Sequence, residues 1–264
     1  MKHNTILVRY SEIGIKGLNR PYFENKLISN MKDCLAKNKV KDFKTKKESG
    51  RILIFTDKKC DKLSNVFGIA SFSHALDILP EDLNKTALSL VKKQKSFRIS
   101  ARRLDKTFPK TSQQINEELG GYILNNKKIK VSLKEPEIDI GVEIINNKIY
   151  IFTETIKGFS GLPVGTEGSA YLRIKNIKNS LVASFLILKR GASLTLSKKL
   201  PKLKKFEYGF EFKVRKENET DKVIVLDETD LIKIKKEKDR LILTPLIGLS
   251  EKEINGIYKI INSQ

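Results

Sequence analysis

Apolar residues recur along this chain with two spacings, and these spacings predict alternating strands and amphipathic helices. Phe97, Ile99 and Ala101 alternate with polar residues, which is the pattern of a half-buried strand. Between residues 20 and 35, apolar side chains recur every three or four positions, the spacing of one helix face. Because both patterns alternate along the chain, we expect a mixed fold of the α+β and α/β classes.

The same reading assigns an element to most of the chain. Expected strands cover residues 5–10, 40–45, 51–56, 71–78, 97–102, 130–133, 137–145, 148–155, 192–196, 210–215, 223–226 and 231–235. Expected helices begin at residue 19 or 20, near 57, at 80 or 81 (ending at 93), at 112 and at 181 (ending at 189). Asn146-Asn147 predicts a two-residue hairpin turn.

A basic turn follows the strand that contains Phe97. It carries four cations, which are Arg102, Arg103, Lys106 and Lys110. Ser112 is expected to cap the following helix, whose free N–H groups and dipole also attract anions. This pattern indicates a phosphate-binding turn, although an exposed loop that is simply basic gives the same pattern.

The charge of the chain points to a polyanionic partner. Its 264 residues include 52 Lys and Arg against 31 Asp and Glu, a formal net charge of +21. Lys and Arg side chains that contact phosphates release counterions, so an excess of this size favours nucleic acid. An AT-rich genome would also supply many lysines, but it does not explain why acidic residues fail to balance them.

Cysteine usage and hydropathy indicate a cytoplasmic protein. Cys34 and Cys60 are the two cysteines, and neither belongs to a Cys-x-x-Cys pair, so we expect a reducing compartment and no bound metal. The longest apolar run, residues 181–188, is far shorter than the roughly 18 residues of a membrane span. We therefore expect no contact with a membrane.

Three strings resemble known families. After residue 101, the expected strand leads into Arg-Arg-x-Asp-Lys-x-Phe-Pro and then into Ser-x-x-Ile-Asn. This order resembles the THUMP domain, an RNA-binding module of tRNA-modifying enzymes. The string VRYSEIGIKGLNRPYFENKL (residues 8–27) resembles the start of the tRNA 4-thiouridine synthase family. Residues 136–168, which include the linker 161–166, resemble the same family.

The resemblance implies three domains. These are a ferredoxin-like domain (1–78), a THUMP domain (79–165) and a truncated, Rossmann-like PP-loop domain (166–264). Lys16, Arg20 and Lys157 then become weaker candidates for phosphate contacts.

The nucleotide loop that this family carries is degenerate here. Its Ser-Gly-Gly-x-Asp-Ser motif falls on Lys175, Asn176, Ile177, Lys178, Asn179 and Ser180. Paired glycines let backbone N–H groups approach phosphates, whereas Asn176 and the β-branched Ile177 do not. Ser180 is retained, and we expect it to cap the helix over 181–189. No cysteine follows Cys60, so the family's sulfur-transfer cysteine has no counterpart.

Three interpretations of the function remain open. The first is a tRNA-binding protein without catalytic residues or cofactor, which holds the acceptor stem and CCA end and delivers tRNA to a separate modifying enzyme. The alternative is a divergent ATP-dependent tRNA 4-thiouridine synthase, which needs ATP and Mg²⁺. The sequence leaves open whether the protein forms a homodimer, as members of this family tend to do. A generic scaffold is the third interpretation.

Overall fold

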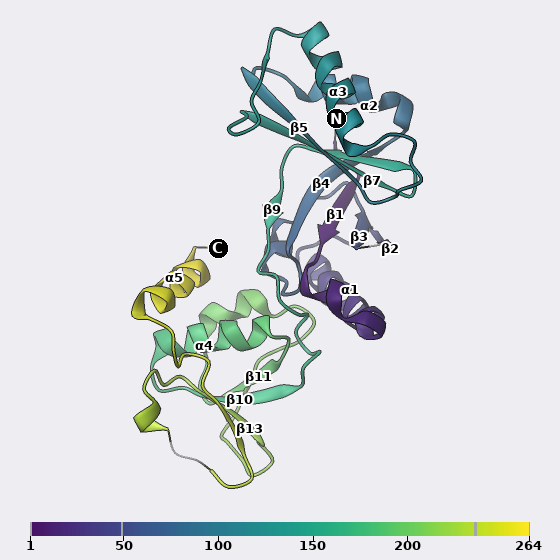
Figure 1. Cartoon of the computed structure of the whole chain (residues 1–264). Helices are drawn as coiled ribbons and strands as arrows, with labels where there is room; N and C mark the ends of the chain where they lie inside the picture. The colour runs from purple at the N-terminus through teal and green to yellow at the C-terminus, as the bar shows by residue number, and fades with distance from the viewer. Residues whose placement is uncertain (1, 49, 235–236, 264) are drawn as a thin grey trace. The chain divides into compact units, whose positions relative to one another are not determined.

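The structure, a computed structural model, describes residues 2–48, 50–234 and 237–263 (Figure 1). It divides into two compact units. The first unit combines Met1–Arg9, Val40–Asp61 and Ser71–Lys157, and the second combines Tyr10–Lys39, Lys62–Ala70 and Gly158–Gln264. Each unit is thus built from separate chain segments. The domain boundaries expected after residues 78 and 165 stay predictions.

The first unit is organised around a nine-stranded sheet of order β2-β3-β1-β4-β8-β7-β5-β6, with β9 beside β4. Its strands are β1 (Thr5–Arg9), β2 (Lys44–Glu48), β3 (Arg51–Phe55), β4 (Ser71–Ile78), β5 (Ser96–Arg103), β6 (Lys130–Val131), β7 (Ile138–Ile145), β8 (Lys148–Phe152) and β9 (Ile156–Lys157). Strand β4 joins the two halves, because its first residues pair with β1 and its last with β8.

Two helices cover one face of the β5-β7-β8 part of this sheet. They are α2 (Leu83–Leu90), which follows the 3-10 helix Pro80–Asp82, and α3 (Ser112–Asn126). They pack against each other, and Figure 1 shows both of them above β5 and β7. Alternate residues of β5, β7 and β8 point into the core below these helices, including Ile99, Ile140 and Ile151. The residues that alternate with these core residues along each strand therefore line the opposite, helix-free face.

Most elements expected in this unit are present, with local corrections. The hairpin turn at Asn146-Asn147 is confirmed, since both residues have positive φ and Ile145 pairs with Lys148. The cap of α3 is Thr111 rather than Ser112, because Thr111 and Gln114 form a reciprocal capping box.

Several element bounds were also wrong. Strand β2 begins at 44 rather than 40, and α2 ends at 90 rather than 93. The short helix expected from residue 57 is the 3-10 helix Asp61–Asn65.

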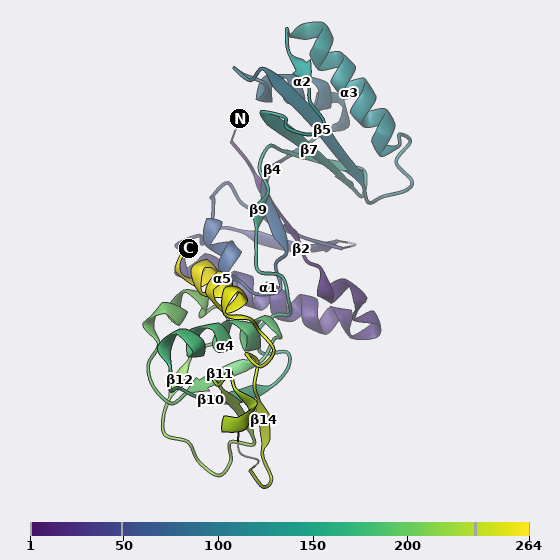
Figure 2. The ribbon, with the colours of Figure 1, turned by 60° about the vertical axis from the view of Figure 1, so that its left-hand side comes forward.

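The second unit contains a parallel sheet of order β12-β11-β10-β13-β14. Its strands are β10 (Ser169–Arg173), β11 (Ser193–Leu196), β12 (Lys213–Val214), β13 (Val223–Leu226) and β14 (Leu241–Leu243). Helices α4 (Ile177–Lys189) and α5 (Glu251–Asn262) lie on the same side of this sheet (Figure 2). The unit also holds α1 (Arg20–Lys37) and the 3-10 helices Glu12–Ile15, Gly17–Asn19, Pro201–Phe206 and Leu231–Lys233.

This sheet has a Rossmann-like switch of direction at its centre. The chain leaves β10 through α4 to β11 on one side, whereas β13 lies on the other side of β10. In open parallel sheets, ligands bind at the carboxyl ends of strands at such a point. Residues 231–233 form a 3-10 helix instead of the start of the strand expected over 231–235, and residue 235 lies outside the described residues. Among the described residues, no helix is both long and apolar enough to cross a membrane.

Candidate nucleic-acid interface

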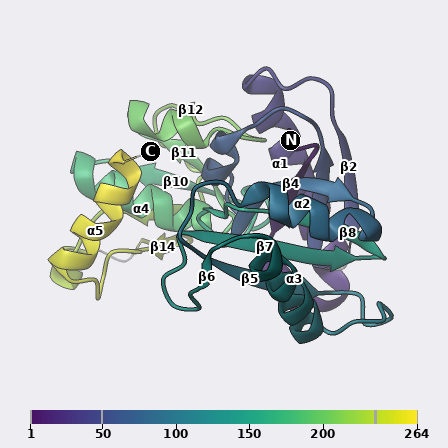
Figure 3. The same ribbon diagram turned by 90° about the horizontal axis from the view of Figure 1, so that it is seen from above.

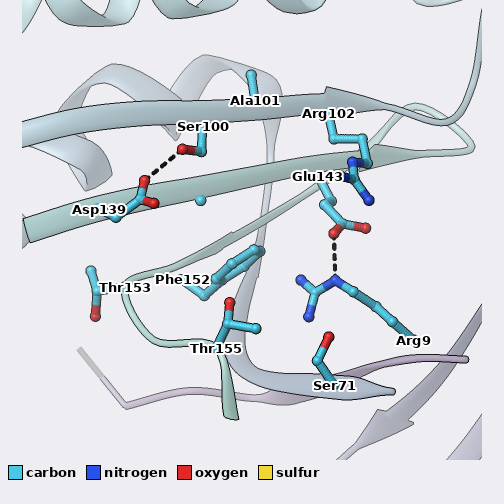
Figure 4. Close-up of a pocket in the computed structure, with 11 residues that line it drawn as sticks. Arg9, Ser71, Ser100, Ala101, Arg102, Asp139, Glu143, Phe152, Thr153 and Thr155 are labelled. Carbon is cyan, nitrogen blue, oxygen red and sulfur yellow. Dashed lines mark hydrogen bonds and ion pairs between the residues drawn. The ribbon is translucent and has the colours of Figure 1, made fainter. Parts of the chain in front are cut away.

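The helix-free face of the first unit contains a pocket of about 420 Å³ (Figure 4). Its walls come from β1, β4, β5, β7 and β8 and from the segment that follows β8. The lining residues are Arg9, Ser71, Ser100, Ala101, Arg102, Asp139, Gly141, Glu143, Phe152, Thr153 and Thr155. Pockets of a few hundred Å³ are of the size that takes a small ligand or part of a larger one.

A buried ion-pair cluster forms one end of the pocket. Glu143 accepts a hydrogen bond from Arg9 Nε (2.7 Å) and another from Arg51 Nε (2.6 Å), one on each carboxylate oxygen. Burial alone would raise the pKa of Glu143, but the charges and hydrogen bonds of the two arginines outweigh it and lower this pKa. The carboxylate is therefore ionised and holds both guanidinium groups in place.

Arg102 adds a further positive charge beside this cluster. Parallel pairing of β5 with β7 places Arg102 directly opposite Glu143. Arg102 is exposed, and within the described residues its guanidinium makes no hydrogen bond or ion pair. With Arg9 and Arg51, it places three guanidinium groups around the single carboxylate of Glu143, so this cluster carries an excess of about two positive charges.

Phe152 keeps Arg9 in position. Strand pairing sets Phe152 opposite Gly141, and the ring lies so close to the strand that a Cβ on Gly141 would be 2.2 Å from Phe152 Cε2. The Arg9 guanidinium carbon lies 4.8 Å from the centre of the same ring. Stacking of a guanidinium on an aromatic face is favourable and fixes its plane. Gly141, Phe152 and Arg9 therefore form one layered wall.

The other end of the pocket is polar. Asp139 accepts hydrogen bonds from Ser100 Oγ (2.6 Å) and from the guanidinium of Arg98. Hydroxyl groups of Ser71, Thr153 and Thr155 also line the pocket. Arginines at one end and hydroxyls with a carboxylate at the other suit a ligand that carries a phosphate next to sugar or base hydrogen-bonding groups.

The residues of the predicted basic turn do not act together. Arg102 enters the pocket, whereas the Arg103 guanidinium donates to the backbone oxygens of Phe108 (2.9 Å) and Lys110 (3.4 Å) and so holds the turn closed. Lys110 forms an ion pair with Glu118. Lys106 is exposed on the turn. The residues expected to form one phosphate site are thus divided between the pocket and the turn.

The three weaker candidates lie in different surroundings. Lys157 is exposed on β9 opposite Ser71, which lines the pocket. Lys16 belongs to the second unit, where it faces Glu167 at 3.5 Å and lies above the Phe23 ring.

Arg20 also belongs to the second unit, where it is part of a network with Tyr10 and Glu24. Its Nε donates to Glu24 at 2.8 Å and to the Tyr10 hydroxyl at 3.1 Å. Burial and the hydrogen bond to Glu24 raise the pKa of Tyr10 to about 12. This network holds the Arg20 side chain against α1, and its predicted phosphate contact stays a prediction.

The segment predicted to be a degenerate nucleotide loop, Lys175–Ser180, runs from the end of β10 into the first turn of α4, at the carboxyl end of the central strand. Its anion position is filled by the buried Asp227, which directly follows β13. One carboxylate oxygen accepts the backbone N–H groups of Lys175 (2.9 Å) and Asn176 (2.8 Å) and the hydroxyl of Ser180 (2.5 Å). The predicted cap at Ser180 is wrong, because Asn176 caps α4 by accepting from Asn179 N (3.0 Å).

Two residues of this loop also contact Asp227 and its neighbour Glu228. Asn179 donates its side-chain amide to the backbone oxygen of Asp227, and Lys175 pairs with Glu228 at 2.6 Å. Ile177 is exposed at the start of α4, and Lys178 is half-buried. Among the described residues, no cluster of three or more His, Cys, Asp or Glu side chains is arranged to hold a metal ion.

Reading the sequence missed Arg9, Arg51 and Glu143. The signal was present, because each is a charged residue within or at the end of a strongly apolar strand, where an unpaired charge is costly. Their pairing was not visible, since Arg9 and Glu143 are 134 residues apart.

Comparison with known proteins agrees with this architecture. Residues 5–73 match the model of the ThiI ferredoxin-like domain, and residues 80–154 match the model of the THUMP domain. The chain is a THUMP-domain protein that resembles the tRNA 4-thiouridine synthase family. The expected ferredoxin-like domain, THUMP domain and Rossmann-like sheet are therefore confirmed.

Curated relatives of this THUMP-domain protein include two probable tRNA sulfurtransferases. That of Thermococcus kodakarensis is 38% identical over 205 residues, which cover 72% of this chain and 54% of the relative. That of Natranaerobius thermophilus is 39% identical over 208 residues, which cover 72% of this chain and 50% of the relative. The THUMP-domain protein thus spans about half the length of these relatives.

Two solved structures share the fold over nearly the whole chain. The crystal structure of PH1313 from Pyrococcus horikoshii matches with a TM-score of 0.84 and 31% identity, covering 98% of this chain and 99% of that one. A 4-thiouridine synthetase in complex with RNA and ATP matches with a TM-score of 0.77 and 26% identity, covering 99% and 86%. The similarity of the THUMP-domain protein to these structures includes the parallel sheet of the second unit.

Proposed function

We propose that this protein binds tRNA through the pocket of the first unit and acts in tRNA modification without carrying out the chemistry itself. The observation that supports RNA binding is Arg102, an exposed guanidinium beside the Arg9–Glu143–Arg51 cluster with no partner among the described residues. Arginine binds phosphate through two parallel hydrogen bonds, and the polar end of the pocket offers contacts for the ribose or base.

The acceptor stem and CCA end are the parts of tRNA that we expect the protein to contact. The unpaired end of a tRNA presents accessible phosphates, sugars and base edges, whereas a paired stem presents shape and backbone. The pocket has room for a nucleotide of the unpaired end. As an adaptor, the protein would present this end to a separate modifying enzyme.

The absence of catalysis is supported by the second unit. The anion position at the start of α4 is occupied by Asp227, and the glycines that would admit a phosphate are replaced by Asn176 and Ile177. A carboxylate there repels a phosphate and would have to leave its hydrogen bonds before ATP entered. Neither ATP nor Mg²⁺ is therefore part of the proposed function.

A second candidate is an ATP-dependent tRNA sulfurtransferase. It is favoured by the names of the curated relatives and by the similarity to a 4-thiouridine synthetase that binds RNA and ATP. Under this alternative, Asp227 would move when ATP binds, and the protein would release pyrophosphate in the presence of tRNA.

Binding of Arg102→Ala to whole tRNA tests the proposed RNA site. We expect a roughly tenfold loss of affinity, since one charge-assisted phosphate contact is removed. Arg190→Ala is the matched control, because the Arg190 side chain is 77% exposed and lies in the second unit. Equal losses in the two variants would show that general charge, rather than the pocket, binds the RNA.

A further inference from the structure

Two lysine-rich loops of the first unit meet at the beginning of β5. One loop, residues 91–95, joins α2 to β5, and the other, residues 127–129, joins α3 to β6, which begins at Lys130. Strands β5 and β6 are parallel neighbours (Figure 3), and Lys130 N donates to Lys95 O at 3.0 Å. The ammonium group of Lys127 donates to Val91 O and ties the loops together.

The junction of these loops forms a pocket of about 760 Å³, which we name the lysine pocket. It is lined by Lys92, Lys93, Gln94, Lys95, Lys128, Ile129 and Lys130. All five of these lysines are exposed, and within the described part of the chain none forms an ion pair. The carboxylate next to the pocket, Glu137, accepts the backbone N–H of Lys95 at 2.9 Å.

Three other lysines of the same unit lie beside carboxylates instead. Lys110 pairs with Glu118, Lys148 lies 3.2 Å from Asp77, and Lys2 lies 2.5 Å from Asp57. Five ammonium groups around one hollow repel one another, and the repulsion falls when a ligand supplies several negative charges. A ligand with several phosphates at nucleic-acid spacing meets this need and releases the counterions that the lysines otherwise hold.

We propose that the lysine pocket binds the phosphate backbone of a paired RNA stem. This inference rests on the proposed function and extends it, because the lysine pocket and Arg102 lie at opposite ends of β5. Strand β5 has 8 residues, which at about 3.3 Å per residue span roughly 25 Å. A ligand that contacts both ends has to extend over this distance, as the stem and unpaired end of a tRNA do.

The two ends of β5 then have different tasks. The pocket at Arg102 holds a nucleotide of the unpaired end, whereas the lysine pocket contacts stem phosphates without reading sequence. The lysine pocket thus sets the direction in which the stem leaves the protein.

The test compares two triple variants of equal charge. Lys92→Gln, Lys93→Gln and Lys95→Gln together remove three charges from the lysine pocket. Lys198→Gln, Lys199→Gln and Lys204→Gln remove three exposed charges from the second unit. Each variant is titrated over a salt series with whole tRNA and with a short single-stranded RNA that ends in CCA. Anionic phosphatidylserine vesicles serve as a second polyanionic probe.

We expect the lysine-pocket variant to bind whole tRNA at least tenfold more weakly, and its slope of log K against log salt to fall by about 2 to 3. Its binding of the short RNA should stay unchanged, and the control variant should change whole-tRNA affinity by less than about threefold. An equal loss in the control, or an equal loss for the short RNA, would overturn the stem contact. Lysine-dependent binding of the vesicles without an effect on tRNA would assign the pocket to a membrane surface instead. If the unaltered protein binds neither RNA, the proposed function itself fails.

Discussion

The hydroxyl of Ser180 donates a hydrogen bond to the buried carboxylate of Asp227, and their oxygens are 2.5 Å apart. The same carboxylate oxygen accepts two backbone N–H groups from the loop before α4. The protein therefore supplies its own anion at the helix N-terminus, beside the central strand of the parallel sheet. Helix N-termini favour negative charge, and here that preference is met internally.

The first prediction is that ATP does not bind. Entry of a phosphate would require Asp227 to leave its three hydrogen-bond donors. Isothermal titration with millimolar ATP and Mg²⁺, with and without tRNA, should give no binding heat, and no pyrophosphate should be released. Saturable binding in the micromolar range would contradict this prediction and would favour the sulfurtransferase alternative.

The second prediction concerns the stability of the second unit. Asp227→Ala leaves three donors without an acceptor in a buried place, so the free energy of unfolding should fall by about 3 kcal/mol. Asp227→Asn keeps an oxygen acceptor and should cost roughly 1 kcal/mol. Urea unfolding of both variants measures the difference. Equal, small losses would mean that the carboxylate is not held as tightly as the distances indicate.

The third prediction is a pH dependence caused by Glu143. Arg9 and Arg51 lower the pKa of Glu143 in the folded protein, so its contribution to stability is fully present above the unfolded pKa, near 4.5. As the pH falls below this value toward the folded pKa, the unfolded state binds the proton first and stability is lost. Unfolding curves at successively lower pH should show this loss.

Glu143→Gln is the matched variant for that experiment. It cannot ionise, so its stability should depend less on pH over the same range. At neutral pH it should be less stable by about 3 kcal/mol, because two buried arginines then lack a counter-charge. Parallel acid curves for the two proteins would show that other carboxylates cause the loss.

The fourth prediction concerns the layered wall of the pocket. In Gly141→Ala the new Cβ would lie 2.2 Å from the Phe152 ring, so the ring has to move. We expect a destabilisation of about 2 kcal/mol and weaker RNA binding, since the ring also supports Arg9. The double variant with Phe152→Ala should show strong non-additivity in stability, because the clash is then absent. Additive losses of stability would show that the Phe152 ring does not lie against residue 141.

The fifth prediction separates two neighbouring arginines. Arg102→Ala should weaken RNA binding while the melting temperature stays unchanged. Arg103→Ala removes the donors to Phe108 O and Lys110 O, so the turn should loosen, with a cost of about 1 kcal/mol. Hydrogen exchange across residues 104–110 together with RNA affinity measures both effects. Faster exchange in Arg102→Ala would contradict the assignment.

The local elements of this protein could be predicted from the sequence. Alternating and helical spacings depend on neighbouring residues, and they indicated β4 (Ser71–Ile78) and β13 (Val223–Leu226) with their observed bounds. Family-like strings indicated the ferredoxin-like and THUMP domains. Details that depend on backbone angles were missed, such as Thr111 rather than Ser112 as the cap of α3.

The site was predicted in part. The sequence placed Arg102 on the contact surface, which stays a prediction, and the structure sets it beside Arg9 and Glu143. It could not separate Arg102 from Arg103, because successive residues of a strand face opposite sides and the position of each side depends on the sheet.

The sequence by itself determined most of the secondary structure, the excess of positive charge and the presence of Asn176 and Ile177 rather than glycines. Only the tertiary structure decided that Glu143 holds two arginines and that Asp227 fills the start of α4. The physical reason is that periodicity shows which residues share a face of a strand, but strand order decides which charges meet across that face. Asp227 and Ser180 are 47 residues apart, and they meet because β10 and β13 are neighbours in the sheet.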